Sequence, residues 1–444
     1  MTTTDIAASY KRQFVASRAS LPGARQRWLS DLRDDAIERF ALRGLPTQRL
    51  EDWKYTSLTP FAKTQFNLAT AATARIDGER IERFLLRGVP HHQLVFIDGR
   101  YDAKLSQLGT MPAGLAIRSL AAILDEGGDV LSEHFPSVGV GRDQAFAALN
   151  TAFMADGAFI RVGRGVCVEE PIHLLFVTSG ASATATQPRI FVIAEAGCAL
   201  TLLQTYADIG TDETSSLTNA VTEISAAPGA IVRDYKLQRE GTGAFHIATT
   251  AVRLGSDAVY DSFALAVGAR LCRNEIHAVL DGGGIGCRLN GAHLLRGRQH
   301  TDTTTVIDHV RAGSRSEENY KCVLDDAARS VFQGRIIVRP DAQKTDARQM
   351  NRNLLLSRQA QADSKPELRI EADDVKCSHG ATIGELDANS VFYLRTRGID
   401  EKAARNLLIE GFIGELVDEV HVGSVQVHLR QAMWSWLSRS RGYT

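Results

Sequence analysis

A cysteine and a histidine two positions apart, Cys377 and His379, are the residues in this sequence best suited to hold a metal ion. Side chains two positions apart point to the same face of a strand. A thiolate and an imidazole together suit iron and other soft-to-borderline metals. Two ligands do not close a metal site, so further ligands would have to come from elsewhere. The alternative is a buried cysteine beside a hydrogen-bonded histidine at the end of a strand.

The other cysteines and histidines supply no second metal motif. No two cysteines have C-x-x-C spacing, which argues against a disulfide framework and against a cluster held by four local thiolates. Reduced thiols are expected at all six positions, which are Cys167, Cys198, Cys272, Cys287, Cys322 and Cys377. His300 and His309 bracket a polar stretch, and we expect them to hydrogen-bond their neighbours rather than bind metal.

Several catalytic and nucleotide-binding motifs are absent from the sequence. It contains no P-loop, no H-E-x-x-H and no G-x-S-x-G, so we expect no ATP to bind this chain through a P-loop. The glycine-rich run at 282–286 lacks dinucleotide-binding spacing and is expected to form a turn.

Composition and charge limit the classes of binding partner that we expect. Lys plus Arg is 51 and Asp plus Glu is 52, a balance that favours neither nucleic acid nor an anionic membrane. No apolar run approaches the roughly 18 residues that span a bilayer. The first fifteen residues contain no apolar signal-peptide core. We therefore expect a cytoplasmic protein.

The segment that must position Cys377 and His379 is rich in short β-type runs. These runs are Ile172–Val177, Ile190–Ile193, Ala230–Tyr235, Val259–Val267, Ile336–Val338 and Leu368–Ile370. Small or acidic turns separate many of them, as at 195–197, 227–229, 255–257, 281–283 and 325–326. Such a series predicts a parallel β-helix or a β-sandwich. We favour the β-helix because hairpin signals are scarce, the pair Asn290-Gly291 being the main exception.

Helical patterns flank this β-rich core. Residues 10–43 carry apolar residues three and four apart, residues 94–97 form a short strand, and a helix is expected near 120–131. Asp400 is a plausible N-cap for an amphipathic helix over 401–420, and 425–437 continues the helical region. The predicted fold is mainly β. Its parts are an N-terminal helical region (1–90), a mixed connection (91–146), a β-helix core (147–382) and a C-terminal helical region (383–444).

The C-terminal half also contains several uncommon sequence motifs that resemble those of the SufB/SufD family of iron–sulfur cluster assembly scaffolds. They occupy 342–347, 353–357, 372–382, 392–399 and 411–412, and 51–56 is similar to the N-terminal signature of the SufD branch. The clear match spans about 300–420, and 102–290 is matched only loosely. In the SufB branch a cysteine stands where this chain has Leu394 and a glutamate where it has Gly380. Neither Leu394 nor Gly380 can donate to iron.

The resemblance implies a right-handed parallel β-helix between helical ends, acting as a scaffold of the SUF machine and not as an enzyme. It implies a SufB-like partner subunit and a SufC-type ATPase docked on the C-terminal helices. The residues expected in the docking face are Phe392, Tyr393, Leu408, Phe412 and Leu416. The alternative for this apolar stripe is packing on the chain's own β-domain.

The resemblance further implies that Cys377 and His379 lie near the SufB-like partner, where they would hold iron or a transient iron–sulfur cluster. Whether a reduced flavin binds the complex stays open, as does homodimer formation when the chain is alone. Two other functions compete with this one: a SufB-like main scaffold, and a β-helix enzyme acting on polysaccharides through Asp373-Asp374 or Glu317-Glu318.

Overall fold

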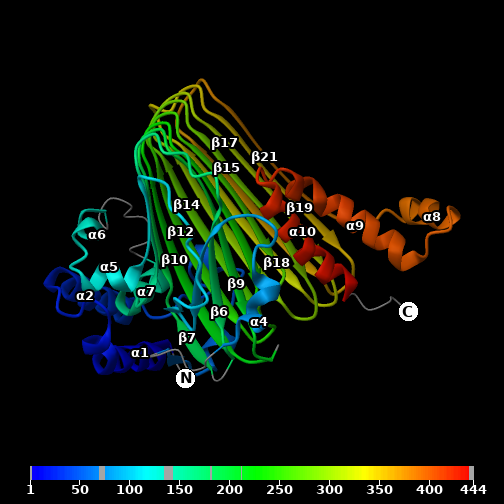
Figure 1. Ribbon diagram of the computed structural model, residues 1–444. Helices are drawn as coiled ribbons and strands as arrows, with labels where there is room; N and C mark the ends of the chain where they lie inside the picture. Colours follow the sequence, from blue (N-terminus) through cyan, green and yellow to red (C-terminus); the bar gives the residue numbers. More distant parts are fainter. Residues whose placement is uncertain (1–2, 70–75, 135–143, 181–182, 212, 440–444) are drawn as a thin grey trace.

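The computed structural model describes residues 3–69, 76–134, 144–180, 183–211 and 213–439. Its core is a β-helix of about eight turns, built from two sheets whose strands alternate along the chain (Figure 1). Almost all neighbouring strands in both sheets are parallel, and the tight hairpins of a β-sandwich do not connect them. The predicted parallel β-helix is therefore confirmed.

The first sheet has, in spatial order, β20 (Gln361–Ile370), β18 (Arg329–Val338), β16 (His300–His309), β14 (Leu271–Leu280), β12 (Phe245–Leu254), β10 (Ser216–Ala226), β8 (Arg189–Ala194), β5 (Gly157–Val162) and β4 (Leu115–Ser119). Two short strands, β1 (Asn67–Leu68) and β7 (Thr184–Thr186), join it at the side of β10.

The second sheet has the order β21 (Lys376–Glu385), β19 (Asp346–Leu355), β17 (Arg315–Leu324), β15 (Gly286–Leu295), β13 (Val259–Ala266), β11 (Ile231–Arg239), β9 (Ala199–Asp208), β6 (Ile172–Thr178), β2 (His92–Ile97) and β3 (Arg100–Tyr101).

Alternation along each strand sends one set of side chains into the β-helix and the other outward. The interior of the early turns is an apolar cluster that includes Leu174, Val192, Leu202, Ile224 and Val252. Outward residues on both sheets are also covered over large areas, because helices pack on them. Strands buried on two faces read as continuous apolar or mixed runs, which is why the pattern alone left the architecture open.

The turns fall where small and acidic residues predict them. Gly197 and Gly229 have positive φ values of 69° and 72°. Asp257 and Asp326 adopt the same left-handed region, with φ of 58° and 52°. Asn290-Gly291, in contrast, lies in the middle of β15 and forms no hairpin. A side chain at Gly291 would overlap the ring of Tyr320 on the next turn, so this glycine is needed for packing.

The boundaries of the β-helix differ from those predicted. Helix α7 (Ala145–Phe153) occupies the start of the predicted core, and β21 continues to Glu385. The mixed connection contributes β2 and β4 to the sheets, so the β-helix begins before residue 147. The short helices α5 (Leu120–Asp125) and α6 (Asp129–His134) occupy the predicted helical segment there.

The N-terminal helices cover outer faces of both sheets: most of them pack on the first sheet, whereas Ile81 and Phe84 pack on β2, β6 and β9 of the second sheet. These helices are α1 (Thr3–Ser17), α2 (Arg27–Arg43), α3 (Thr59–Ala62) and α4 (Gly78–Ile81), with short 3₁₀ helices η1 (Arg18–Ser20), η2 (Glu51–Trp53) and η3 (Glu82–Phe84). Phe61 and Phe146 pack against Phe245 and Ile247 of β12 in one apolar cluster. This layer makes the N-terminal region part of one body with the β-helix.

The C-terminal helices are α8 (Ala388–Thr396), α9 (Glu401–Asp418) and α10 (Gly423–Ser438). Asp400 caps α9 as predicted, since its side chain accepts a hydrogen bond from the Ala403 amide at 3.0 Å. Helix α10 and part of α9 lie along the second sheet, whereas α8 stands clear of the β-helix (Figure 1). Among the described helices, none is both long and apolar enough to cross a membrane.

Candidate functional site

The last turn of the β-helix has uncovered strand edges. Within the described chain, β20 pairs only with β18 and β21 pairs only with β19, which leaves one edge of each strand without a strand partner. Most of β21 is exposed, including Ile383 at 54%. Pro366 in β20 lacks an amide hydrogen and interrupts one of these edges, which limits indiscriminate strand addition.

Cys377 and His379 lie on β21 and share its inner face, as their spacing predicts. They are in register with Ala347 and Gln349 of β19, which are buried inside the β-helix. Cys377 is half-buried against the apolar cluster around Ala347, and His379 is exposed. Their side chains reach the surface because no further turn covers them, which makes the inner face of β21 an end surface.

The surroundings of Cys377 favour the protonated thiol over the thiolate. Partial burial raises its pKa above the ordinary value, and the Asp346 carboxylate adds to this increase. A metal ion would therefore have to displace a proton, which makes binding dependent on pH. Among the described residues, no group of three or more His, Cys, Asp or Glu is arranged to hold a metal.

A buried polar pair lies directly beneath His379. Gln349 donates a hydrogen bond from Nε2 to the Glu318 carboxylate on the preceding turn. Burial raises the pKa of Glu318 to about 7, an effect partly offset by hydrogen bonds from Thr305 and Gln349. A side chain at Gly334 would overlap the Gln349 amide, so this glycine makes room for the pair. Sequence patterns did not identify the pair, since both residues look like ordinary polar surface positions.

The other candidate groups have structural roles. His300 Nε2 lies 2.9 Å from Thr56 Oγ1, and His309 Nε2 lies 2.8 Å from Ser316 Oγ, as expected for a polar ladder. Burial raises the pKa of Cys322 to about 12, which makes its thiol unreactive.

The acid pairs considered for polysaccharide chemistry do not form a site. Glu317 is exposed on the outer face of β17, whereas Glu318 points into the β-helix, so the two carboxylates cannot act on one bond. Asp373 and Asp374 are both exposed in the loop between β20 and β21, where Asp374 pairs with Lys344.

The predicted docking residues divide between an exposed and a buried group. Phe392 and Tyr393 on α8 are 68% and 57% exposed. Leu408 and Phe412 on α9 are half-buried, and the Lys321 ammonium lies 5.0 Å from the centre of the Phe412 ring. Leu416 is only 1% exposed, because it packs on the second sheet.

Leu416 is therefore corrected to a core residue. An amphipathic stripe shows which residues are apolar but not which neighbour covers each of them. Leu407, one position before a predicted docking residue, is 48% exposed and was missed. The exposed apolar surface of this region thus comprises Phe392, Tyr393 and Leu407, which we call the arm surface.

These features define a class: a parallel β-helix scaffold with one uncovered end and a projecting helical arm. The SUF system FeS cluster assembly, SufBD core domain family matches residues 176–412, and the SufBD protein N-terminal region matches residues 4–174. The chain belongs to the SufB/SufD family of iron–sulfur cluster assembly proteins, on its SufD branch. The matches also cover 102–290, where the resemblance was loose.

Curated relatives agree with this placement. An iron–sulfur cluster assembly SufBD family protein of Synechocystis sp. is 33% identical over 428 residues, covering 95% of this chain and 94% of the relative. SufD of Escherichia coli is 30% identical over 386 residues, covering 86% and 87%. SufD of Bacillus subtilis is 26% identical over 420 residues, covering 90% and 92%.

Proposed function

We propose that this chain is a non-catalytic scaffold subunit that pairs its uncovered end with a SufB-like subunit. The unpaired edges of β20 and β21 favour association with another β-helix end. Exposed apolar side chains at that end, Ile370 and Ile383, add surface that a partner would bury.

In this complex Cys377 and His379 would contribute ligands to iron or a nascent iron–sulfur cluster. The observation that carries this proposal is their shared position on the inner face of the last turn, at the uncovered end. The partner would supply the remaining ligands. Gly380 has no donor atom, and a side chain there would meet the Met350 methyl group at 2.8 Å, which supports a subsidiary role for this chain in building the cluster.

The arm surface would dock a SufC-type ATPase, which supplies the nucleotide chemistry. Phe392 and Tyr393 lie on a helix that makes little contact with the β-helix, so a partner can reach them (Figure 1). ATP binding would bring two docked ATPases together and pull on the arms of both scaffold subunits. The strain would expose ligands at the subunit interface, which requires the closed state to be favoured by differential binding energy.

A reconstituted complex of this chain, a SufB-like subunit and a SufC-type ATPase tests the ligand role. His379→Ala should lower the iron and sulfide bound per complex while the elution volume stays that of the wild-type complex. Ser378→Ala is the matched control, because Ser378 lies between the two ligands but points to the outer face. Equal cluster yield in His379→Ala and wild type would remove His379 from the proposal.

The isolated chain gives a second test of the uncovered end. Without a SufB-like partner, we expect two copies to cover each other's edge strands and form a homodimer. Ile383→Asp should place a charge in that contact and shift the mass measured by light scattering toward the monomer. A monomeric wild-type chain at micromolar concentration would contradict this expectation.

A further inference from the structure

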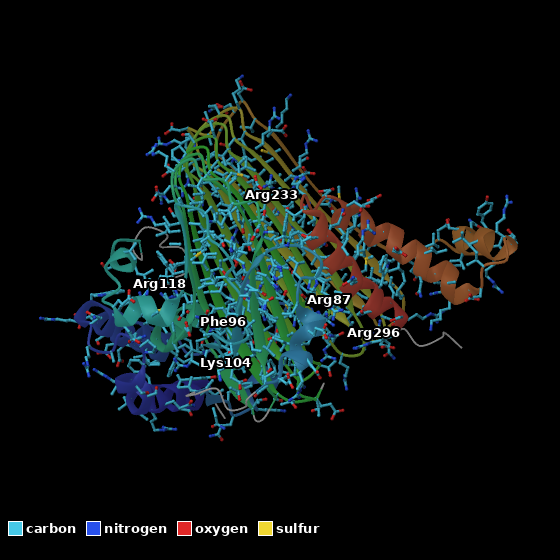
Figure 2. All side chains as sticks on the ribbon, in the orientation of Figure 1. Arg87, Phe96, Lys104, Arg118, Arg233 and Arg296 are labelled. Carbon is cyan, nitrogen blue, oxygen red and sulfur yellow. The ribbon has the colours of Figure 1, made fainter. Side chains whose placement is uncertain are left out.

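A small pocket with an excess of positive charge lies beside the C-terminal end of α10, away from the uncovered end of the β-helix. It has a volume of about 260 Å³. Three guanidinium groups line it: Arg239 at the end of β11, Arg296 after β15, and Arg439 after α10. Figure 2 shows Arg296 next to the end of this helix.

Arg239 is the most important of the three arginines for the charge of the pocket, because it is half-buried and has no carboxylate as an ion-pair partner among the described residues. Its guanidinium lies 4.9 Å from the centre of the Phe84 ring. Burial, together with the nearby charges of Arg83 and Arg439, lowers the pKa of Arg239 to about 10. Like charges gathered in this way repel each other, and a bound anion would relieve that repulsion.

The one carboxylate in the pocket lining, Glu240, forms no ion pair with Arg239 and is engaged by other side chains. Glu240 is buried, with Oε2 2.8 Å from His246 Nδ1 and Oε1 accepting a hydrogen bond from Thr218 at 2.6 Å. Gln238 also donates to Glu240 Oε2 at 2.9 Å. Both oxygens of Glu240 thus contact side chains that are buried in the β-helix.

Arg296 is held in a fixed position at the pocket. Its guanidinium carbon lies 4.0 Å from the centre of the Trp436 ring, and its Nη2 donates to the Trp436 carbonyl. Stacking on an aromatic ring reduces the side-chain entropy that binding would otherwise cost. Gln299 Oε1 accepts a hydrogen bond from the Arg296 backbone amide at 3.0 Å, which stabilises the loop after β15.

We propose that this pocket binds the phosphate or pyrophosphate group of a small ligand. Guanidinium groups match the oxygens of phosphate with paired, charge-assisted hydrogen bonds. The volume lies just below the range of about 300–1,000 Å³ that is usual for drug-sized ligands, which favours a compact anion over a dinucleotide. The site is separate from Cys377 and His379 and does not depend on the role proposed for them.

Inorganic pyrophosphate, titrated into the full chain by isothermal calorimetry, tests the site. Arg239→Gln should weaken binding at least tenfold. Arg298→Gln is the matched control, because Arg298 is an exposed arginine two positions from Arg296 that does not line the pocket. The control should bind as the wild type does. Pyrophosphate should also raise the melting temperature of the wild type and of Arg298→Gln, but not that of Arg239→Gln.

A second variant covers the case in which Arg239→Gln folds poorly. Arg439→Gln changes an exposed side chain and should leave the melting temperature unchanged while weakening pyrophosphate binding several-fold. An equal loss in Arg298→Gln and Arg239→Gln would show unspecific charge attraction and overturn the proposal. Failure of the wild type to bind pyrophosphate, or binding of a glutamate-rich peptide in its place, would overturn it as well.

Discussion

Replacing Trp53 by alanine should remove a large part of the stability that holds the N-terminal region on the β-helix. Trp53 is buried, stacks on Phe146 with ring centres 5.7 Å apart, and carries the Arg273 guanidinium 3.9 Å from its ring centre. Arg273 is fully buried and donates to Glu275 Oε1 at 2.7 Å and to the Asp302 carboxylate. Trp53 therefore covers one face of a buried charge network.

The expected loss follows from what the truncation removes. A large buried aromatic residue changed to alanine typically costs about 3–5 kcal/mol, because apolar contacts are lost and a cavity remains. Removing the ring from the buried Arg273 adds a cation–π contribution on the order of 1–2 kcal/mol. Collapse of the site and entry of water would offset part of the sum. We therefore expect the free energy of unfolding to fall by about 4 kcal/mol.

Urea denaturation followed by far-ultraviolet circular dichroism measures this loss, since fluorescence would change with the tryptophan itself. Trp434→Ala is the matched control. Trp434 lies on α10, is 48% exposed, and donates its indole hydrogen to Glu410 Oε1 at 2.9 Å. Its removal should cost about 1 kcal/mol or less. Equal midpoints for the two variants would refute the idea that Trp53 covers the buried arginine.

Three further outcomes are expected. Phe412→Asp should lower the melting temperature of the isolated chain because the ring packs on the second sheet, whereas Phe392→Asp should leave it unchanged and weaken capture by a SufC-type ATPase. Burial raises the pKa of Glu318 to about 7, whereas the pKa of a glutamate in the unfolded chain is about 4.3. As the pH rises from about 4.3 to about 7, the free energy of unfolding therefore falls by on the order of 3 kcal/mol. Replacement of Glu318 by glutamine should therefore stabilise the protein at pH 8 relative to the wild type, in urea denaturation, and have little effect at pH 4. Gly291→Ala should cost about 1–3 kcal/mol in the same assay by overpacking, whereas Gly384→Ala, with open space around it, should cost less.

The sequence predicted the parts of the fold that depend on apolar runs and turn residues. The strand at Ile172–Val177 and the turn at 255–257 are examples, and each needs only local chemistry. The stretch from His300 to His309 forms a complete strand although four of its residues are threonines. Thr301 donates to the Cys272 carbonyl on the preceding turn at 3.2 Å, and Thr304 donates to Asp302 of its own strand at 3.3 Å. Local periodicity contains no information about such partners.

The predictions that were wrong also failed because they depended on neighbours in space. Residues 145–153 form an apolar run short enough to be a buried strand or a buried helix, and only packing against the first sheet decides for the helix. Leu416 and Leu407 both lie in the apolar stripe of α9, yet the first is buried by the second sheet and the second is exposed. Position relative to another element, and not residue type, separates core from candidate docking surface.

The uncovered end also explains why the proposed ligands lie in the last turn. Cys287 and Cys377 belong to one inward column of the second sheet, separated by Ser316 and Ala347. Cys287 is buried, and burial raises its pKa so strongly that no thiolate forms near neutral pH. Cys377 has the same orientation but is only half-buried, because no turn follows it. The opposite end is closed by β3 and β4, which pair antiparallel with their neighbours. Among the described strands, the inner face is therefore uncovered only where the β-helix stops.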